Sequence, residues 1–381
     1  MSQITTILRG ARETYEIPVL FQHAGAWVED ALTQAGVCVG TMETAEDTVL
    51  LLGAPCPELT AAAYTRLIQN HQAMGADFTV FAQTMPSRGA DDSIVRLASD
   101  TLPVVCAQKK AAEMLAEGDL IAAVNAALQK GCTAEAVQIP PVTVVTDGVS
   151  AFEAQKHLCA AINMKHIAAG VQIFAPDSVY IAPDAKIGAG TVILPGTIIR
   201  AGCTIGSGAV IGPNALLEQA QIGDRTSVNS SQIYESTIGS DATVGPFAYV
   251  RPGCKVGNHT RVGDFVELKK AEIGNGTKVA HLTYVGDATV GERVNFGCGT
   301  VVVNYDGYNK FHTDIGDDCF LGCNTNLIAP VKLGDRVFTA AGTTVTKDVP
   351  DGALTVGRSR QSTLEGWNDK RRARMEEEKK K

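Results

Sequence analysis

The stretch "KIGAGTVILPGTIIRAGCTIGSGAVIGPN", residues 186–214, places an aliphatic side chain at every sixth position, from Ile187 to Ile211. The next residue is often glycine, which suits a tight turn where a side chain would clash. The same period resumes over Ile238–Leu268 and Ile315–Val345. Such a period is typical of a parallel β-helix, in which each hexapeptide forms one flat side and three hexapeptides close a triangular coil. The sequence therefore predicts roughly nine coils between Ile181 and Val345, stacked at about 4.8 Å.

The composition is that of a globular protein. Of 381 residues, 45% are hydrophobic and 6% aromatic, and the formal net charge is −8. An acidic chain whose basic residues cluster only in the tail "NDKRRARMEEEKKK" is not expected to bind nucleic acid. The ten cysteines form no CxxC pair, and no signal peptide or long apolar run is present. We expect a cytoplasmic protein with no membrane partner.

The first 150 residues have a different pattern. Apolar runs at 47–53 and 77–83 alternate with helical stretches at 59–75 and 109–131, which is typical of an α/β domain. A further helical stretch then leads into the repeats. The predicted boundaries are 1–149 for the α/β domain, 150–174 for a linker helix, 175–357 for the β-helix and 358–381 for a C-terminal arm with a charged tail.

The repeat period places residues on the coils. Arg251 and Lys269 each follow an interior aliphatic residue and lie one coil apart, so two cations should stack. Stacked like charges favour an anion between them, and phosphate suits an arginine with a lysine. The alternative is a pair of solvated surface groups with Glu267 or Glu272 as partners.

One edge of the predicted prism carries small side chains above a histidine. The loop "NYDGYNKFHTD", residues 304–314, is expected to leave the helix between Val302 and Ile315. The other two edges carry mostly larger or polar groups, so only this edge forms a groove, about 14 Å long over three coil steps, enough for the pantetheine arm of a coenzyme A. The residues of this edge are Asp264, His281, Cys298, Cys323 and Ala341.

A histidine at the foot of such a groove suits acyl transfer to an amine. Neutral imidazole accepts the proton that the amine loses near pH 7. We expect Asp264 to orient the His281 ring, and Asn304 or Tyr305 to reach the site and stabilise the developing oxyanion. A purely structural histidine is the alternative, and the groove and the cation pair together argue against it.

The segments "GPFAYVRPG", "GDFVELKKAEIG", "AHLTYVGDATVGERVNFGCGT" and "NYDGYNKFHTDIGDDCFLG" resemble the acetyltransferase half of the bifunctional N-acetylglucosamine-1-phosphate uridyltransferase/glucosamine-1-phosphate acetyltransferase family. The resemblance runs from about Ala175 to Trp367. The exposed flat sides of the prism usually need partners, so we expect a homotrimer. The resemblance implies a left-handed β-helix, sites at the subunit interfaces and His281 as general base. The residues that it implies for the sugar phosphate are Arg251, Lys269, Tyr284, Asn295 and Lys310, and those for acetyl-CoA are Cys298, Asn304, Tyr305, Cys323, Ala341 and Arg358.

This sequence departs from the family in both halves. The family usually has alanine at position 298 and serine at 323. The two cysteines here are also small, so the groove is kept but carries two thiols. In the front half, "ILRGARETYEIPVLF" lacks the family's glycine-rich LxAGxGTRM loop, and "LLLGAPCPEL" has Ala54 or Pro55 where a metal-binding aspartate is expected. We therefore expect a shortened, degenerate nucleotidyltransferase-like domain, with no uridyl transfer and no Mg²⁺.

The resemblance predicts a glucosamine-1-phosphate N-acetyltransferase in the biosynthesis of UDP-N-acetylglucosamine, a cell-wall precursor. One alternative keeps the chemistry and changes the amino-sugar phosphate or the acyl group. Another is a regulatory or scaffolding trimer without turnover. A zinc-bearing β-helix hydratase fits least, because His259, His281 and His312 include no close pair at ligand spacing.

Overall fold

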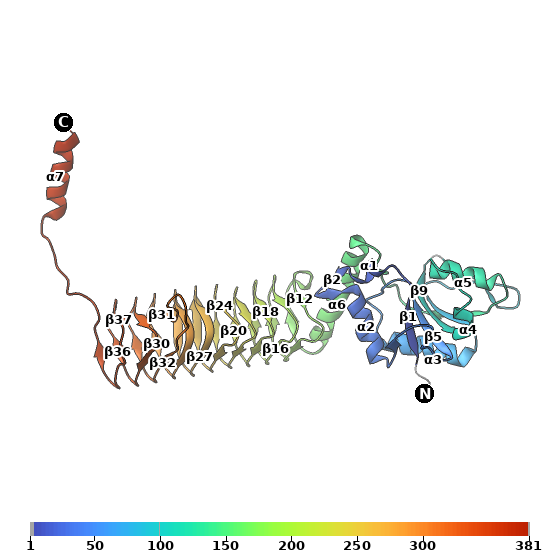
Figure 1. The fold of residues 1–381 in the computed structure, drawn as a ribbon, viewed down its shortest axis with the longest axis horizontal. Coiled ribbons are helices and arrows are strands. Elements are labelled where there is room, and N and C mark those ends of the chain that lie inside the picture. Colours follow the sequence, from blue (N-terminus) through green and yellow to red (C-terminus); the bar gives the residue numbers. More distant parts are fainter. Residues whose placement is uncertain (1–3, 99, 380–381) are drawn as a thin grey trace. The chain divides into compact units, whose positions relative to one another are not determined.

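The computed structural model describes residues 4–98 and 100–379. By its contacts the chain divides into two compact units, Met1–Thr204 with Ile211–Glu218, and Ile205–Val210 with Gln219–Lys381. An α/β domain occupies the N-terminal part and stacked short strands occupy the rest (Figure 1).

The N-terminal domain is built on a six-stranded sheet of order β10-β6-β9-β5-β1-β4. Strand β9 runs antiparallel to both of its neighbours, and the other pairs are parallel. The strands are β1 (Thr5–Leu8), β4 (Cys38–Val39), β5 (Thr48–Leu52), β6 (Phe78–Ala82), β9 (Thr101–Gln108) and β10 (Ala134–Gln138). Two short antiparallel pairs accompany the sheet, β2 (Pro18–Val19) with β3 (Gln22–His23), and β7 (Ser87–Arg88) with β8 (Ile94–Arg96).

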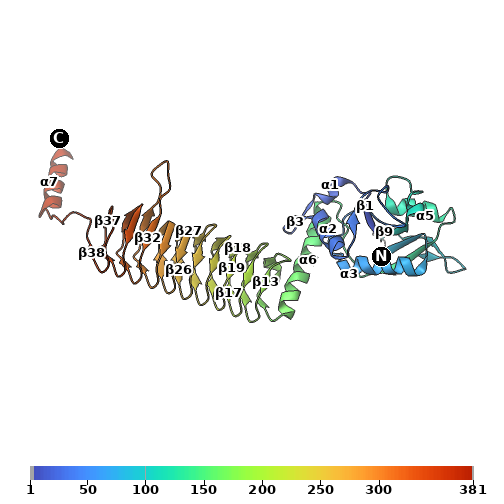
Figure 2. The same cartoon turned by 60° about the horizontal axis from the view of Figure 1, so that its bottom comes forward.

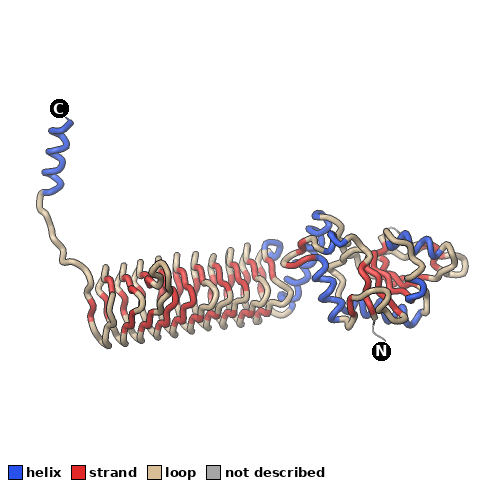
Figure 3. Tube along the Cα trace, in the orientation of Figure 1, coloured by secondary structure: helices blue, strands red, loops and turns tan. Residues whose placement is uncertain are grey.

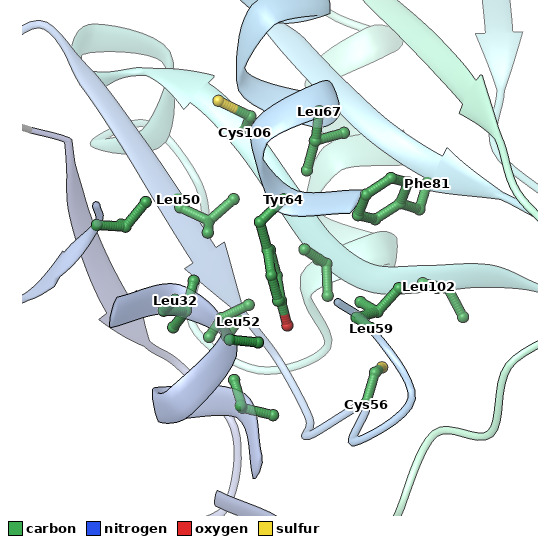
Figure 4. Packing of buried hydrophobic residues seen from close by; sticks show 14 of the residues in the cluster. Leu32, Leu50, Leu52, Cys56, Leu59, Tyr64, Leu67, Phe81, Leu102 and Cys106 are labelled. Atoms are coloured by element: carbon green, nitrogen blue, oxygen red, sulfur yellow. The ribbon is translucent and has the colours of Figure 1, made fainter. Parts of the chain in front are cut away.

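Both faces of this sheet are covered. Side chains alternate along β5, so Leu50 and Leu52 enter one core while Val49 and Leu51 enter the other. Tyr64 stands in the middle of the first core (Figure 4). The helices of this domain are α1 (Arg12–Tyr15), α2 (Ala24–Gln34), α3 (Ala61–Met74), α4 (Lys109–Ala112) and α5 (Leu120–Leu128). A sheet buried on both faces accounts for the nearly continuous apolar runs in the sequence.

The strands and the first helix predicted here are confirmed, but the single helical stretch predicted over 109–131 is wrong. It forms two helices, α4 and α5. Helix α4 ends at Ala112, and Gly118, with φ +106°, lies in the connection that follows it. Asp119 then begins α5, since its side chain accepts a hydrogen bond from the Ala122 amide at 2.9 Å.

Helix α6 (Gly148–Ala168) connects the domain to the repeats. It begins with a capping box in which Asp147 and Ser150 bind each other's backbone. Leu158 packs in a small core with Val19 and Val145. Near the other end, the Asn163 amide donates to the backbone carbonyls of Pro176 and Val179 at 3.0 and 3.1 Å. The linker helix is thus fixed at both ends.

The predicted parallel β-helix is present. One side is an 11-stranded sheet, with one strand per coil. Its strands are β11 (Gln172–Ile173), β14 (Val192–Ile193), β17 (Val210–Ile211), β20 (Ser227–Val228), β23 (Thr243–Val244), β26 (Arg261–Asp264), β28 (Lys278–His281), β30 (Asn295–Phe296), β33 (Phe320–Leu321), β36 (Phe338–Thr339) and β38 (Leu354–Thr355). The helix therefore extends beyond the predicted span of roughly nine coils at both ends.

The other two sides belong to a 17-stranded sheet. Its strands are β12 (Tyr180–Ile181), β13 (Lys186–Ile187), β15 (Ile198–Ile199), β16 (Thr204–Ile205), β18 (Leu216–Glu218), β19 (Gln221–Ile222), β21 (Gln232–Tyr234), β22 (Thr237–Ile238), β24 (Tyr249–Val250), β25 (Lys255–Val256), β27 (Glu267–Ile273), β29 (Tyr284–Val290), β31 (Val301–Val303), β32 (Thr313–Ile315), β34 (Asn326–Ile328), β35 (Val331–Leu333) and β37 (Thr344–Val345). The short strands recur throughout the repeats (Figure 3). The predicted aliphatic ladder is the core, with Val250, Leu268 and Val285 at 0% exposure.

Two features interrupt the regular coils. Several steps between interior residues are five rather than six residues long; after Leu268 and Val285, β27 and β29 run continuously through such a step. The predicted loop leaves the helix between β31 and β32 and is pinned by a bridge between Tyr305 and Lys310 (Figure 2). Helix α7 (Trp367–Lys379) follows the coils and buries no residue. In the described part of the chain, no helix is both long and apolar enough to span a membrane.

Candidate functional site

The strand register confirms the predicted edge. Asp264 pairs directly with His281 between β26 and β28. The next pairings, Val279 with Phe296 and Phe296 with Leu321, carry the column onward to Cys298 and Cys323. Backbone hydrogen bonds from Asn324 to Cys298 and from Gly342 to Cys323, both 2.8 Å, extend it to Ala341. We call these five residues the corner column.

His281 is held by Asp264 within this column. Its Nδ1 lies 2.7 Å from Asp264 Oδ1, so the predicted hydrogen bond is present. The same bond holds the pKa of Asp264 below its ordinary range. Because an ionised carboxylate only accepts, Nδ1 carries the proton and Nε2 is left as a base. The Thr283 hydroxyl fixes the backbone here by donating to the His281 carbonyl at 2.7 Å.

The two predicted cations lie one coil apart, and each has a carboxylate partner. Arg251 lies on the surface and binds Glu267 at 2.9 Å. Lys269 is buried, at 8% exposure, and binds Asp287 at 2.7 Å. Burial is the largest single influence and disfavours the Lys269 ammonium, but the hydrogen bond to Asp287, the contact with Lys310 and the nearby charges together raise the pKa of Lys269. The alternative, in which both cations are solvated surface groups, therefore holds for Arg251 but not for the buried Lys269.

The loop adds a third cation to this cluster. Lys310 folds back so that its ammonium lies close to that of Lys269, and this contact lowers the pKa of Lys310. Tyr284 also lies against the cluster, since its hydroxyl would be 2.3 Å from a Cβ placed on Gly286, the register partner of Lys269. We call this group the cation cluster. It consists of three cations and the tyrosine beside them, Arg251, Lys269, Lys310 and Tyr284, and the arrangement suits a phosphate dianion.

The remaining predicted residues fall in different places. Asn295 lies on the 11-stranded side, one residue before Phe296. Arg358 reaches the top of the corner column, where its Cδ would be 3.5 Å from a Cβ on Gly342. Within this chain, Asn304 lies with the cation cluster rather than with Cys298, because its amide donates to Asp287. Tyr305 is exposed at the base of the loop and donates to the Gly307 carbonyl at 2.5 Å.

Asp287 is the residue that sequence reasoning missed. Burial is the largest single influence on Asp287 and raises its pKa, but its hydrogen bonds from Lys269 and Asn304, with the charges of Lys269 and Lys310, together lower it. Its position on the same edge as Asn304 was readable from the period. The pairing of Asp287 with Lys269 could not be predicted from the period, because it depends on the direction in which both side chains turn at a corner of the coil.

An exposed apolar stripe borders the corner column. Phe247 and Phe265 stack with their ring centroids 5.5 Å apart and are 60% and 59% exposed. Leu282, which directly follows His281, is 57% exposed. Exposed aromatic side chains in a row are typical of a surface that a partner covers.

The N-terminal domain has a hollow of about 920 Å³ whose lining includes Gly53, Thr101, Asp119 and Asn125. Two of its polar side chains are engaged, since Asp119 caps α5 and Asn125 binds the Leu97 backbone, whereas the buried Thr101 hydroxyl has no hydrogen-bond partner among the described residues. In the described ranges, 4–98 and 100–379, no three His, Cys, Asp or Glu residues gather as a metal site.

Residues 184–219, 235–270 and 312–347 match the family model described as "Bacterial transferase hexapeptide (six repeats)", whose repeats fit a left-handed β-helix. The chain is also 35% identical to the bifunctional protein GlmU of Staphylococcus haemolyticus over 404 residues, which cover 96% of this chain and 90% of that protein. The chain belongs to the GlmU family.

Other GlmU proteins match in part. The GlmU of Clostridium perfringens is 52% identical over 211 residues, 55% of this chain and 46% of that protein. The GlmU of Listeria innocua is 47% identical over 223 residues, 58% of this chain and 49% of its own. The chain thus spans about half the length of these GlmU relatives. Among solved structures, a UDP-N-acetylglucosamine acyltransferase from Campylobacter jejuni is 19% identical over 53% of this chain and 78% of its own, with a TM-score of 0.32, which is too weak to argue from.

Proposed function

We propose that the β-helix of this chain transfers the acetyl group of acetyl-CoA to the amine of glucosamine 1-phosphate, a step in the biosynthesis of UDP-N-acetylglucosamine. The observation that carries the proposal is the 2.7 Å hydrogen bond between Asp264 and His281 at the foot of a column of small residues. Membership of the GlmU family supports it.

His281 is the proposed general base. Nε2 takes the proton that the sugar amine loses as its nitrogen attacks the thioester carbonyl. A carbon–nitrogen bond forms, the carbon–sulfur bond breaks, and coenzyme A leaves as the thiolate, to which the proton passes. Asp264 is a positioning residue: it holds the ring with Nε2 free, and its charge stabilises the imidazolium formed during the step.

The cation cluster is proposed to bind the sugar phosphate. Arg251, Lys269 and Lys310 face two carboxylates, Glu267 and Asp287, so the cluster carries a surplus of positive charge. A phosphate that contacts Lys310 relieves the repulsion between the two lysines, and charge-assisted hydrogen bonds are the strong ones. Tyr284 and Asn295 are proposed to contact the sugar.

The corner column and Arg358 are proposed to bind acetyl-CoA, with the pantetheine arm along Cys298, Cys323 and Ala341. Asn304 and Tyr305 lie at the other corner of the same protomer, beside the cation cluster. For them to reach the coenzyme as well, the site must combine two subunits. The exposed stripe of Phe247, Phe265 and Leu282 beside His281 supports such an interface. We therefore propose a cytoplasmic homotrimer with shared sites.

The N-terminal domain is proposed to have lost uridyl transfer and to need no Mg²⁺. After β1, the backbone amides of Arg9 and Gly10 both donate to the Leu52 carbonyl, at 2.8 and 3.2 Å. A Cβ on Gly10 would lie 1.8 Å from the Gly53 carbonyl oxygen. Amides engaged and packed in this way do not cradle a nucleotide phosphate. Pyrophosphate release from UTP and N-acetylglucosamine 1-phosphate by the full chain would contradict this proposal.

The acetyl transfer is tested by coenzyme A thiol release from acetyl-CoA with glucosamine 1-phosphate. His281→Ala should lower kcat by about 10²–10⁴-fold, the usual contribution of a general base. Lys269→Ala should mainly raise KM for the sugar. His259→Asn, an exposed histidine on a neighbouring coil, is the matched control and should keep full activity. A folded trimer without turnover would refute the proposal, and a panel with glucosamine 6-phosphate and other amino sugars would then identify the acceptor.

A further inference from the structure

Two free thiols lie on adjacent coils of the corner column. Cys298 is half-buried and Cys323 is exposed, and neither is in a disulfide. Because Phe296 pairs with Leu321, Cys298 and Cys323 lie at the same register position on neighbouring coils and are directly stacked. A Cβ added to Gly297 would lie 2.5 Å from the Cys323 amide, the same approach that Gly274 and Gly322 show to their neighbouring coils, so the two coils stack with the regular spacing at this point.

This spacing suits a covalent bridge. Stacked residues of a parallel sheet have Cα atoms about 4.8 Å apart, and disulfides span roughly 4.4–6.8 Å between Cα atoms. The other cysteines offer no such pair: Cys203, Cys254 and Cys319 are buried in the coils, and the rest lie in the N-terminal domain and the linker helix. Above Cys323, the next residue of the column is the unreactive Ala341.

The residue below Cys298 is chemically active. His281 is the next member of the corner column, and the bond from its Nδ1 to Asp264 leaves Nε2 as a base one coil away from the thiol. Only a thiolate attacks a disulfide. The His281 imidazole is the nearest side chain of the column to which the Cys298 thiol could pass its proton, so Cys298 is the member of the pair placed to attack.

We propose that Cys298 and Cys323 form a reversible redox pair that closes the coenzyme groove. The Cys298 thiolate attacks a low-molecular-weight disulfide such as oxidised glutathione, releasing one thiol and forming a mixed disulfide. The Cys323 thiolate then displaces the second thiol and forms the protein disulfide, so one small disulfide becomes two thiols. The consequence for coenzyme binding rests on the proposed function, because the bridge lies across the column assigned to the pantetheine arm.

The first readout of the test is chemical. The reduced full chain is treated with oxidised glutathione and digested, and we expect one disulfide-linked peptide pair that contains Cys298 and Cys323. Cys298→Ala and Cys323→Ser restore the residues usual in the family and should abolish the cross-link. Cys38→Ser, at an exposed cysteine elsewhere, should leave it unchanged. Glutathione retained on either cysteine without a cross-link, or two free thiols after treatment, would refute the redox pair.

The second readout is activity, followed as acetylated sugar by chromatography. Oxidation should lower the rate more than about tenfold, because a covalent bridge displaces groups that otherwise bind the coenzyme, and dithiothreitol should restore it. The two cysteine variants should be insensitive. A cross-linked protein with its full rate would overturn the closing of the groove. A cross-link in a protein without any acetyl transfer would refute the proposed function and leave the redox pair standing.

Discussion

A single hydrogen bond defines the chemistry proposed for His281. Asp264 fixes the ring from one side, and the pKa of this carboxyl is held down by the same contact, so it stays ionised across the neutral range. The imidazole and the carboxylate come from neighbouring coils, so their distance is set by the stacking of the backbone rather than by a flexible loop. Sites on rigid elements hold such distances well.

Substitution of Asp264 tests its positioning role. Asp264→Asn keeps the size of the side chain and removes the charge, so we expect kcat to fall by about 10–100-fold, as for other residues that orient an active group. KM for both substrates should change little. Asp241→Asn, which affects a surface pair with Arg225, is the control. An unchanged kcat in Asp264→Asn would remove the role of the carboxylate.

Lys310 predicts a pH dependence. Its pKa is lowered, chiefly by the neighbouring Lys269, so it loses its proton at a lower pH than the ordinary lysine value near 10.4. As pH rises through that lowered pKa, the phosphate loses one cation, and KM for glucosamine 1-phosphate should rise. Arginine stays protonated over this range, so Lys310→Arg should flatten the alkaline rise. Lys255→Arg, in an exposed pair with Glu272, should leave it unchanged, and identical profiles in all three proteins would exclude Lys310.

At the scale of elements, the loop between β31 and β32 carries Lys310 to the coils. Asp306 shapes this loop because its Oδ1 accepts the backbone amides of Tyr308 and Asn309, at 2.8 and 2.6 Å. The loop lies outside the aliphatic core, so its conformation depends on these local hydrogen bonds and on the bridge between Tyr305 and Lys310. Loops of this kind are separable from the stability of the coils.

Removing the Asp306 side chain should therefore affect binding and spare folding. In Asp306→Ala, a loss of about 1 kcal/mol in loop order corresponds to a roughly fivefold higher KM for the sugar phosphate. The melting temperature should stay within error of the parent protein. Tyr308→Ala, at a side chain 91% exposed in the same loop, is the control. A large fall in melting temperature would show instead that the loop supports the coils.

At the scale of the whole molecule, assembly is proposed to complete the site. The stripe of Phe247, Phe265 and Leu282 is exposed in one protomer and borders His281. Burial of such a stripe contributes to association, at about 25 cal/mol per Å² of apolar surface removed from water. Asn304 and Tyr305 lie at a different corner of the chain from the corner column. These two sets of candidate residues are brought together only if subunits meet along this edge.

Phe265→Asp should break the proposed trimer. A charge placed in an apolar interface is costly to bury, so light scattering should report a smaller mass and acetyl transfer should be lost. Circular dichroism should keep the spectrum of the coils. Tyr308→Asp adds the same charge away from the stripe and should leave the trimer intact. A Phe265→Asp monomer with its full rate would contradict the shared site.

The sequence by itself determined the β-helix and most of the corner column. In a solenoid, spatial neighbours are separated by one coil, so counting along the chain places Asp264 under His281 and Cys298 under Cys323. The interior ladder and the site of the loop follow from the same period, because a break in phase marks where the chain leaves the coils. Few proteins permit this, since most contacts join residues at irregular separations.

Only the tertiary structure decided which way side chains turn and which contacts form between residues that the repeat period does not relate. It pairs buried Lys269 with Asp287, brings Lys310 back to that pair, and moves Asn304 away from Cys298 within one protomer. It also divides the stretch 109–131 into the two helices α4 and α5. These outcomes depend on burial, on charge and on local hydrogen bonds such as the Asp119 cap. The period fixes where a residue lies on the coil, whereas its neighbours decide which way the side chain turns.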